Sequence, residues 1–278
     1  TEGKPPVNVK VLLEGEEEAG GAFVEQFVHG NGEQLKADGA LICDTHMNSI
    51  EQPSLICGLR GILYTEIDVR GAVSDLHSGS YGGVAPNPLH ALCLLVSRLK
   101  GEDGRIDIPG IYISSVEVTE EEKQFWQSNR EALESRLLKE MGVGELVGEN
   151  HILPHKRLGI RPTLEVHGIR GGFTAEGAKT VIPAEALAKI SIRLPAGMKP
   201  EDVFLHFEKA VRQKMPHGYS VEVRNLHGGA GVSVSPDNSY VEAAAAAMEQ
   251  IYGIRPVFMR EGGSIPIASL LQEILGVP

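Results

Sequence analysis

The sequence predicts an α/β protein in which one unit is inserted into another. Alternating apolar residues indicate short strands, and amphipathic stretches between them indicate helices. Over residues 61–236 these elements follow the order βαββαβ, which is typical of a ferredoxin-like unit. Residues 1–60 and 237–278 are expected to be parts of a second α/β domain, because the β-α unit at the end cannot bury both of its faces alone.

Two strands are expected in the first part of this second domain. The alternating run 7–13 indicates one, and the apolar run 40–43 indicates the other; a helix is expected over 22–28. The first run leads into the acidic segment 14–18, and the second ends at Asp44. Ligands of open α/β sheets bind at the carboxyl ends of the strands, so these acidic residues are candidates for a site.

The inserted unit has clear helix and strand signals. Asn87 can cap a helix that begins at Pro88 and ends near Gly101. A charged, helical stretch at 117–146 is expected to be an insertion within the unit. Further strands are expected at 63–69, 164–166, 188–194 and 221–223, and a helix at 200–215. After residue 238 the pattern predicts a helix over 240–252, a strand over 256–259, a Gly-rich turn over 260–264 and a helix to 274.

Composition narrows the class of protein. The formal net charge of the 278 residues is −11 and no long Lys/Arg cluster is present, so no nucleic-acid partner is expected. No apolar run approaches the roughly 18 residues of a membrane span, and no membrane partner is expected. The cysteines Cys43, Cys57 and Cys93 lie in apolar stretches and are odd in number, which indicates buried free thiols in a reducing compartment. We therefore expect a cytoplasmic protein.

The acidic segment contains three consecutive glutamates, Glu16 to Glu18, whose like charges repel one another. It is either a solvated acidic turn or a cation site. In a cation site one carboxylate would bind a metal and its neighbour would hold the metal-bound water as a general base. Asp44 at the end of the second strand favours the cation site, because such ions take several ligands.

Other polar residues stand beside glycines. His77 lies in the Gly-rich loop 74–83, where a histidine is commonly a surface residue, although the glycines would let the backbone approach a ligand. The turn 262–264 precedes a helix and could seat a carboxylate or phosphate, but it lacks the Gly-Lys-Ser/Thr of a nucleotide loop. Arg193 could clamp a carboxylate or simply face solvent. His227, beside two glycines, is a weaker candidate.

Five segments stand out in this order: LLEGEEEAG at 12–20, DLHSG and YGG at 75–83, GAKTVIP at 177–183, SIRL at 191–194 and REGGSIP at 260–266. They resemble segments of the dinuclear zinc peptidases of the carnosinase and aminoacylase kind, which include succinyl-diaminopimelate desuccinylase. The order and spacing hold over nearly the whole chain, and the lid domain of that family looks like the inserted ferredoxin-like unit.

The resemblance implies roles for nine residues. Glu17 would be the general base, Glu18 a ligand to one zinc ion and Asp44 a ligand to the other. His77 would reach into the site of the partner subunit and stabilise the tetrahedral oxyanion. Thr180, Arg193, Gly263 and Ser264 would hold the terminal carboxylate of the substrate. His227 would also contact the substrate.

The implied function is metal-dependent hydrolysis of a peptide bond in dipeptides or short peptides with a free C-terminal carboxylate. The implied partners are two zinc ions per subunit, with manganese or cobalt as alternatives, and a second copy bound through the lid. The His-x-Asp motif, the bridging Asp and the final His ligand of the family are not found in the printed chain. We therefore expect the chain by itself to be metal-free and inactive. An N-acyl amino acid deacylase and a non-catalytic dimerisation or ligand-binding fragment are the alternatives.

Overall fold

The computed structural model describes all residues except 1–2, 4–5, 16–21 and 114–115. The chain forms two compact units. Unit 1 consists of Thr1–Leu55, Val234–Pro256 and Ile265–Pro278, and unit 2 consists of Ile56–Ser233 and Val257–Ser264. No helix among the residues described is long and apolar enough to cross a membrane.

The centre of unit 2 is a four-stranded antiparallel sheet. Its strands stand in the order β4-β6-β2-β7, so the first strand in the chain lies between the third and the fourth. This is the arrangement of a ferredoxin-like unit, and the predicted fold class is confirmed. The strands are β2 (Gly61–Arg70), β4 (Thr163–Gly171), β6 (Glu185–Leu194) and β7 (Ser220–Gly229).

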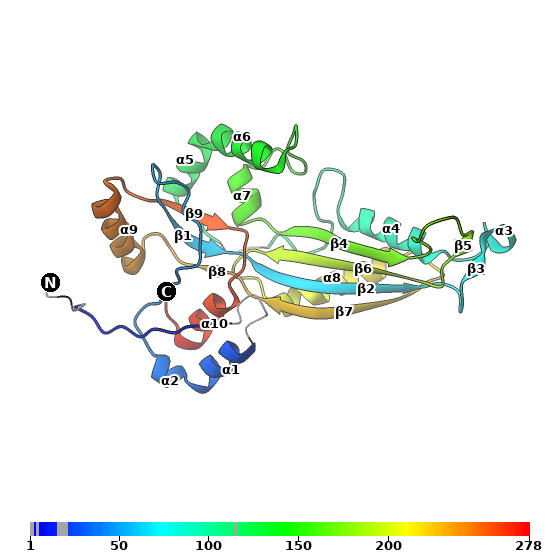
Figure 1. The fold of residues 1–278 in the computed structure, drawn as a ribbon, viewed down its shortest axis with the longest axis horizontal. Helices are drawn as coiled ribbons and strands as arrows, with labels where there is room; N and C mark the ends of the chain where they lie inside the picture. Colours follow the sequence, from blue (N-terminus) through cyan, green and yellow to red (C-terminus); the bar gives the residue numbers. More distant parts are fainter. Residues whose placement is uncertain (1–2, 4–5, 16–21, 114–115) are drawn as a thin grey trace. The chain divides into compact units, whose positions relative to one another are not determined.

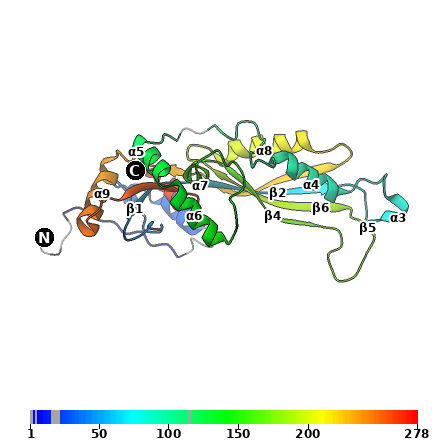
Figure 2. The same ribbon diagram turned by 90° about the horizontal axis from the view of Figure 1, so that it is seen from above.

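Two helices, α4 (Pro88–Leu99) and α8 (Pro200–Lys214), cover one face of this sheet (Figures 1 and 2). Asn87 caps α4 as predicted, because its side chain accepts a hydrogen bond from the Leu89 amide. The helices and the sheet share one apolar core. Burial of each large side chain in it stabilises the folded state by about 1.5–3 kcal/mol. Its fully buried members include Leu63, Ile67, Leu92, Leu95, Ile190, Ile192 and Phe207. The other face of the sheet carries polar side chains.

At one end of the main sheet unit 2 contains a smaller sheet and the helical insertion. The smaller sheet has the order β8-β1-β9, with β1 (Ser54–Leu59), β8 (Val232–Ser233) and β9 (Val257–Glu261). The predicted late strand, β9, therefore lies beside a strand from the first 60 residues. The predicted insertion, 117–146, forms α5 (Glu120–Ser128) and α6 (Arg130–Met141); a further helix, α7 (Pro154–Gly159), follows it and is counted with the insertion below.

At the opposite end of the main sheet the chain extends into a small arm (Figure 1). It contains β3 (Leu76–His77), α3 (Ser78–Tyr81) and β5 (Val181–Ile182), and β3 pairs with β5. The base of the arm is fixed because the Asp75 carboxylate accepts a hydrogen bond of 2.9 Å from the Ala184 amide.

Unit 1 contains four helices among its described residues: α1 (Ala22–Gly30), α2 (Gly32–Leu35), α9 (Ser239–Tyr252) and α10 (Pro266–Leu275). The expected strands at 7–13 and 40–43 do not form. A strand needs a ladder partner for its backbone, and no described strand lies beside either segment. Val11 and Leu13 are accordingly exposed.

The expectation of three buried thiols is wrong for two of them. No cysteine forms a disulfide bond in the described structure, but only Cys57 is buried, and burial raises the pKa of its thiol to about 12. Cys93 is exposed because α4 turns Ala91, Leu92 and Leu95 toward the core and leaves residue 93 on the outer side.

Candidate functional site

The first group of predicted site residues lies where the main sheet meets the Gly-rich turn after β9. Arg193, on the polar face of β6, donates a hydrogen bond of 3.1 Å from Nη1 to Ser264 Oγ. Gly263, which directly precedes Ser264, is exposed, and a Cβ added to it would have no atom within 4 Å. Burial lowers the pKa of Arg193, which means that its charge is partly withdrawn from water. An anion is the natural counterpart of such a group.

Arg60, which the sequence analysis did not single out, stands next to this group. It is 7% exposed, and its Nη1 donates to the carbonyl oxygens of Arg157 and Arg161 at 3.3 and 3.1 Å. Burial and then the charge of Arg193 lower its pKa to about 10. Its buried Nε has no hydrogen-bond partner in the described structure. In the sequence Arg60 is a single arginine between two strands, and nothing there indicates burial.

A second row of polar side chains crosses the same face. The Tyr64 ring lies between two imidazoles, with centroid distances of 5.3 Å to His167 and 5.2 Å to His227. His167 Nε2 also lies 2.7 Å from Ser191 Oγ. Predicted residue His227 therefore belongs to a stacked layer beside Arg193, since Ser191 and Arg193 are two positions apart on β6.

Two β-bulges produce this layer. The register shifts between Val166 and Gly168 on β4, and between Tyr64 and Thr65 where β2 meets β7. An extra residue in a strand reverses which face the following side chains occupy, so His227 comes opposite Tyr64 on the polar face. Simple alternation from Val223 would turn His227 to the core. For this reason the sequence pattern did not indicate His167. Tyr64 follows the regular alternation of β2, but nothing in the sequence marks it as a site residue.

The second group of predicted residues, His77 and Thr180, lies on the arm. Thr180 Oγ1 is 3.1 Å from His77 Nε2, and the Gly79 amide donates to His77 Nδ1 at 3.0 Å. Because Nδ1 is an acceptor, the neutral ring carries its proton on Nε2 and donates it to Thr180. Both side chains are exposed, so this proton donor can reach a ligand.

The two groups stand at opposite ends of the main sheet (Figure 1). Arg193 is paired with Ile62 near the start of β2, whereas the arm begins beyond Arg70 at its end. The eight residue steps from Ile62 to Arg70 span about 26 Å at the usual rise of an antiparallel strand. The structure thus brings Arg193 to Ser264 and His77 to Thr180, but it does not bring the two pairs together in one chain.

The predicted metal ligands are only partly covered by the structure. Glu17 and Glu18 lie outside the described residues. Asp44 is described as an exposed residue of unit 1. No group of three or more His, Cys, Asp or Glu side chains that could hold a metal ion occurs among the residues described. The described residues therefore do not by themselves complete a zinc centre.

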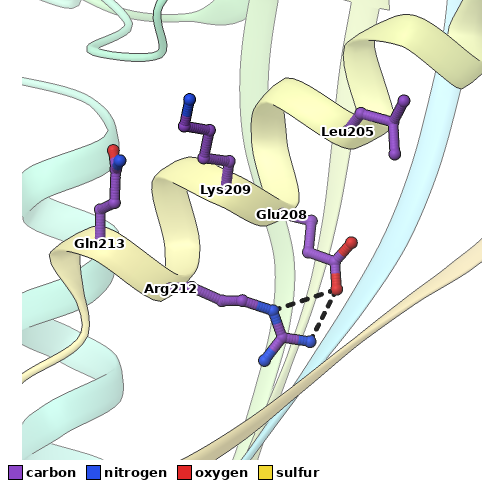
Figure 3. Close-up of a pocket in the computed structure, with 5 residues that line it drawn as sticks. All are labelled: Leu205, Glu208, Lys209, Arg212 and Gln213. Carbon is purple, nitrogen blue, oxygen red and sulfur yellow. Dashed lines mark hydrogen bonds and ion pairs between the residues drawn. The ribbon is translucent and has the colours of Figure 1, made fainter.

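A surface hollow on α8 lies apart from the predicted site residues (Figure 3). Its lining comes from Leu205, Glu208, Lys209, Arg212 and Gln213, with Arg212 paired to Glu208 at 2.6 Å. It contains none of the residues of the polar sheet face or the arm. The candidate site is therefore the polar face together with the arm.

The fold and the site together define a ferredoxin-like module. An arginine suited to binding an anion lies at one end of its sheet, and a histidine that can donate a hydrogen bond lies at the other. Residues 57–219 match the family model described as the peptidase dimerisation domain of the M20 peptidases. This match covers more than half of the chain, and the chain belongs to that family. The predicted resemblance to carnosinase-like metallopeptidases is confirmed.

Relatives of known activity support the assignment. The chain is 35% identical to the Cys-Gly metallodipeptidase of Schizosaccharomyces pombe over 97% of its own length and 58% of that protein. It is 34% identical to the Beta-Ala-His dipeptidase of Rattus norvegicus over 97% of its length and 56% of the relative. Among solved structures, the M20 metallo-carboxypeptidase Sso-CP2 from Sulfolobus solfataricus superposes with a TM-score of 0.78 and 29% identity, covering 95% of this chain and 59% of that one. The chain thus spans somewhat more than half the length of the relatives it matches.

Proposed function

We propose that the complete protein hydrolyses the peptide bond of dipeptides or short peptides that have a free C-terminal carboxylate, in a metal-dependent reaction. The observation that carries this proposal is the Arg193–Ser264 pair beside the glycine turn. The names of the relatives, two dipeptidases and a carboxypeptidase, support the same class of substrate.

The carboxylate would bind to Arg193. No ion pair of Arg193 occurs within the described parts of the chain, although burial already disfavours its charge. A bidentate carboxylate would restore the lost solvation with two charge-assisted hydrogen bonds. Ser264 and the exposed backbone of Gly263 would complete the seat. His227 would border it through the layer that it forms with Tyr64.

His77 and Thr180 would act on a substrate held by a second copy of the chain. A dipeptide spans at most about 7 Å, because each residue extends the chain by no more than ~3.6 Å. It cannot bridge the ~26 Å of β2 that separates Arg193 from the base of the arm. A two-fold dimer in which each arm reaches the other subunit would bring the two groups together. The family description as a dimerisation domain supports this arrangement.

The dimer would form through the lid, for which we take residues 61–236. Two kinds of surface are available there. β4 and β7 are edge strands of the main sheet, each paired on one side only among the described strands. The outer side of α8 presents exposed Leu205 beside charged side chains (Figure 3).

In the proposed reaction the arm supplies the oxyanion donor. The Nε2 proton of neutral His77 would be directed from Thr180 to the oxygen that becomes negative in the tetrahedral intermediate. Glu17 would accept the proton of the attacking water and pass it to the leaving amine. Glu18 and Asp44 would be two of the ligands that hold two zinc ions in the complete protein, and the ions would supply Lewis acidity there.

A variant of Glu17 in the complete protein tests the reaction. Glu17→Gln keeps the size and polarity of the side chain but removes the base. We expect unchanged metal content and a loss of turnover of at least about 10²-fold, the lower range for a positioned base. The measurements are elemental analysis and kcat on a dipeptide. Near-normal turnover with the metals bound would remove Glu17 from the mechanism.

A substrate panel distinguishes the proposed activity from its alternatives. Dipeptides, their C-terminal amides and N-acyl amino acids are assayed with the same preparation. Preference for free-acid dipeptides supports the proposal, whereas preference for N-acyl amino acids would make the protein a deacylase. Binding of free acids without turnover in the metal-loaded protein would indicate a non-catalytic ligand-binding protein.

A further inference from the structure

A buried ion pair joins the helical insertion to the Gly-rich turn. Arg260 of β9 donates to Glu122 of α5 from Nε at 2.6 Å and from Nη2 at 3.3 Å. The two side chains are 2% and 0% exposed. Such a pair loses its solvation on both sides, and apolar residues of similar size commonly stabilise a fold equally well. A role in fixing a local geometry accounts for this pair better than a contribution to stability.

The remaining hydrogen bonds of the pair make that geometry rigid. Arg260 also donates to Ser233 Oγ at 2.7 Å and to the Glu117 carbonyl at 3.0 Å. Glu122 accepts from the Thr119 amide at 2.9 Å as part of the capping box of α5. The orientation of the Arg260 side chain is thus set by α5 and β8 at once.

The turn that follows Arg260 is packed from the other side as well. A Cβ on Gly262 would lie 2.3 Å from Arg60 Nη2 and 2.9 Å from the Leu158 carbonyl. A Cβ on Gly159 would lie 2.8 Å from the Cβ of Arg260. Both glycines are therefore required by close approach, and α7 holds the backbone of the turn against Arg60. Two residues beyond Gly262, Ser264 meets Arg193 at 3.1 Å.

We propose that Glu122 and Arg260 are positioning residues for carboxylate recognition: they hold the Gly262–Ser264 turn where Ser264 and Arg193 can bind one carboxylate together. This inference rests on the proposed function, because it concerns the same carboxylate seat. Glycine-rich backbone has little stiffness of its own, so the place of Ser264 depends on these anchors. A shift of about 1 Å in such a seat can lower activity by up to about 10²-fold. The helical insertion would in this way determine how well a free acid is recognised.

The test compares free-acid dipeptides with their C-terminal amides in the complete protein. Glu122→Gln removes the charge but keeps an acceptor, and we expect KM for the acid to rise at least about tenfold while KM for the amide changes little. Glu149→Gln is the matched control. Glu149 forms a bidentate pair with Arg161 just beyond the insertion, at 2.5 Å for both contacts, and it has no hydrogen bond or ion pair with β9 among the described residues. We expect it to lower Tm without changing the ratio of acid to amide.

A double variant separates positioning from stability. Glu122→Leu with Arg260→Met replaces the pair by apolar residues and should keep Tm near that of the wild type, even if Glu122→Gln does not fold. We expect its preference for the acid to remain impaired. A wild-type Tm together with a wild-type acid-to-amide ratio would overturn the inference, as would an equal change of the ratio in Glu149→Gln.

The shift of Tm on adding a free-acid dipeptide, compared with its amide, provides a readout that needs no turnover. If the wild type shows the acid-specific shift but hydrolyses nothing, the proposed reaction fails and the positioning role is still decided by the shift in the variants. If the wild type shows neither the acid-specific Tm shift nor hydrolysis, both the proposed carboxylate seat and the positioning role are contradicted.

Discussion

Arg193 is a half-buried arginine whose guanidinium donates to Ser264 and is partly desolvated. The described residues provide no ion pair for this charge, which is costly to bury alone, and we therefore assign Arg193 to a carboxylate of the substrate. A purely structural arginine would be indifferent to the charge of a ligand. A comparison of substrates with a C-terminal carboxylate and substrates with a C-terminal amide therefore shows whether Arg193 binds the carboxylate.

Replacing Arg193 by methionine should abolish the preference for free acids. Charge-assisted hydrogen bonds contribute about 1.5–3 kcal/mol each, so kcat/KM for a free-acid dipeptide should fall by ~10²-fold or more. The value for the C-terminal amide should change little. Arg193→Lys, which keeps the charge but loses the planar pair of donors, should lie between the two. Equal losses on acid and amide would show that Arg193 is structural.

Sequence reasoning finds some residues of the site and misses others for a physical reason. Arg193 and Ser264 stand in recognisable segments, and alternation places Arg193 on the polar face of its strand. The burial of Arg60 depends on the packing of α7 against the turn, which joins residues about a hundred positions apart. His167 is placed by a bulge, and a bulge has no reliable signature in a single sequence.

The elements that the sequence predicts correctly are those that carry their own signals. β2 and β6 alternate over ten residues, and α4 has both a cap and an N-terminal proline. The run 7–13 alternates equally well, yet no strand forms there. Alternation specifies faces, but a strand exists only where a neighbour accepts its hydrogen bonds. The described residues provide no such neighbour for this segment.

The contact between α5 and α7 should make the free energy of unfolding depend on pH. His155 of α7 stacks on Trp126 at 6.0 Å, and its buried Nδ1 has no hydrogen-bond partner in the described structure. Burial, and then the charge of Arg136, lower the pKa of His155 from 6.5 to about 4. Between these values the unfolded chain binds more protons than the folded one. The free energy of unfolding should therefore fall as the pH falls from about 6.5 to 4, and His155 should add no slope above 6.5.

Urea unfolding at several pH values between 4 and 8 measures this effect. In His155→Leu the part of the slope between pH 4 and 6.5 that belongs to this residue should disappear. His217, which is exposed and outside the insertion, offers the control substitution His217→Leu, which should keep the slope. The same pH dependence in His155→Leu and in the wild type would show that His155 is not buried as a neutral ring.

At the scale of the whole molecule, metal binding should distinguish the printed chain from the complete protein. Zinc in enzymes is held by about three protein ligands per ion. The described residues contain no group of three potential ligands, and Glu18 and Asp44 would supply one carboxylate each. We expect less than one zinc ion per chain after gel filtration of the 278-residue chain, and no dipeptidase activity. Two tightly held zinc ions per chain in elemental analysis would show that our ligand assignment is wrong.

The central claim is that the two groups of site residues, which lie at opposite ends of one sheet, meet between two copies of the chain. Mixing the complete protein carrying His77→Ala with the same protein carrying Arg193→Met tests it most directly. Random pairing gives heterodimers in half of the molecules, each with one intact composite site, so the mixture should recover about a quarter of wild-type dipeptidase activity. A mixture of Arg193→Met and Ser264→Ala, both altered at the same end, should recover nothing. If the first mixture is no more active than its two components alone, the site is not shared between subunits and the account is contradicted.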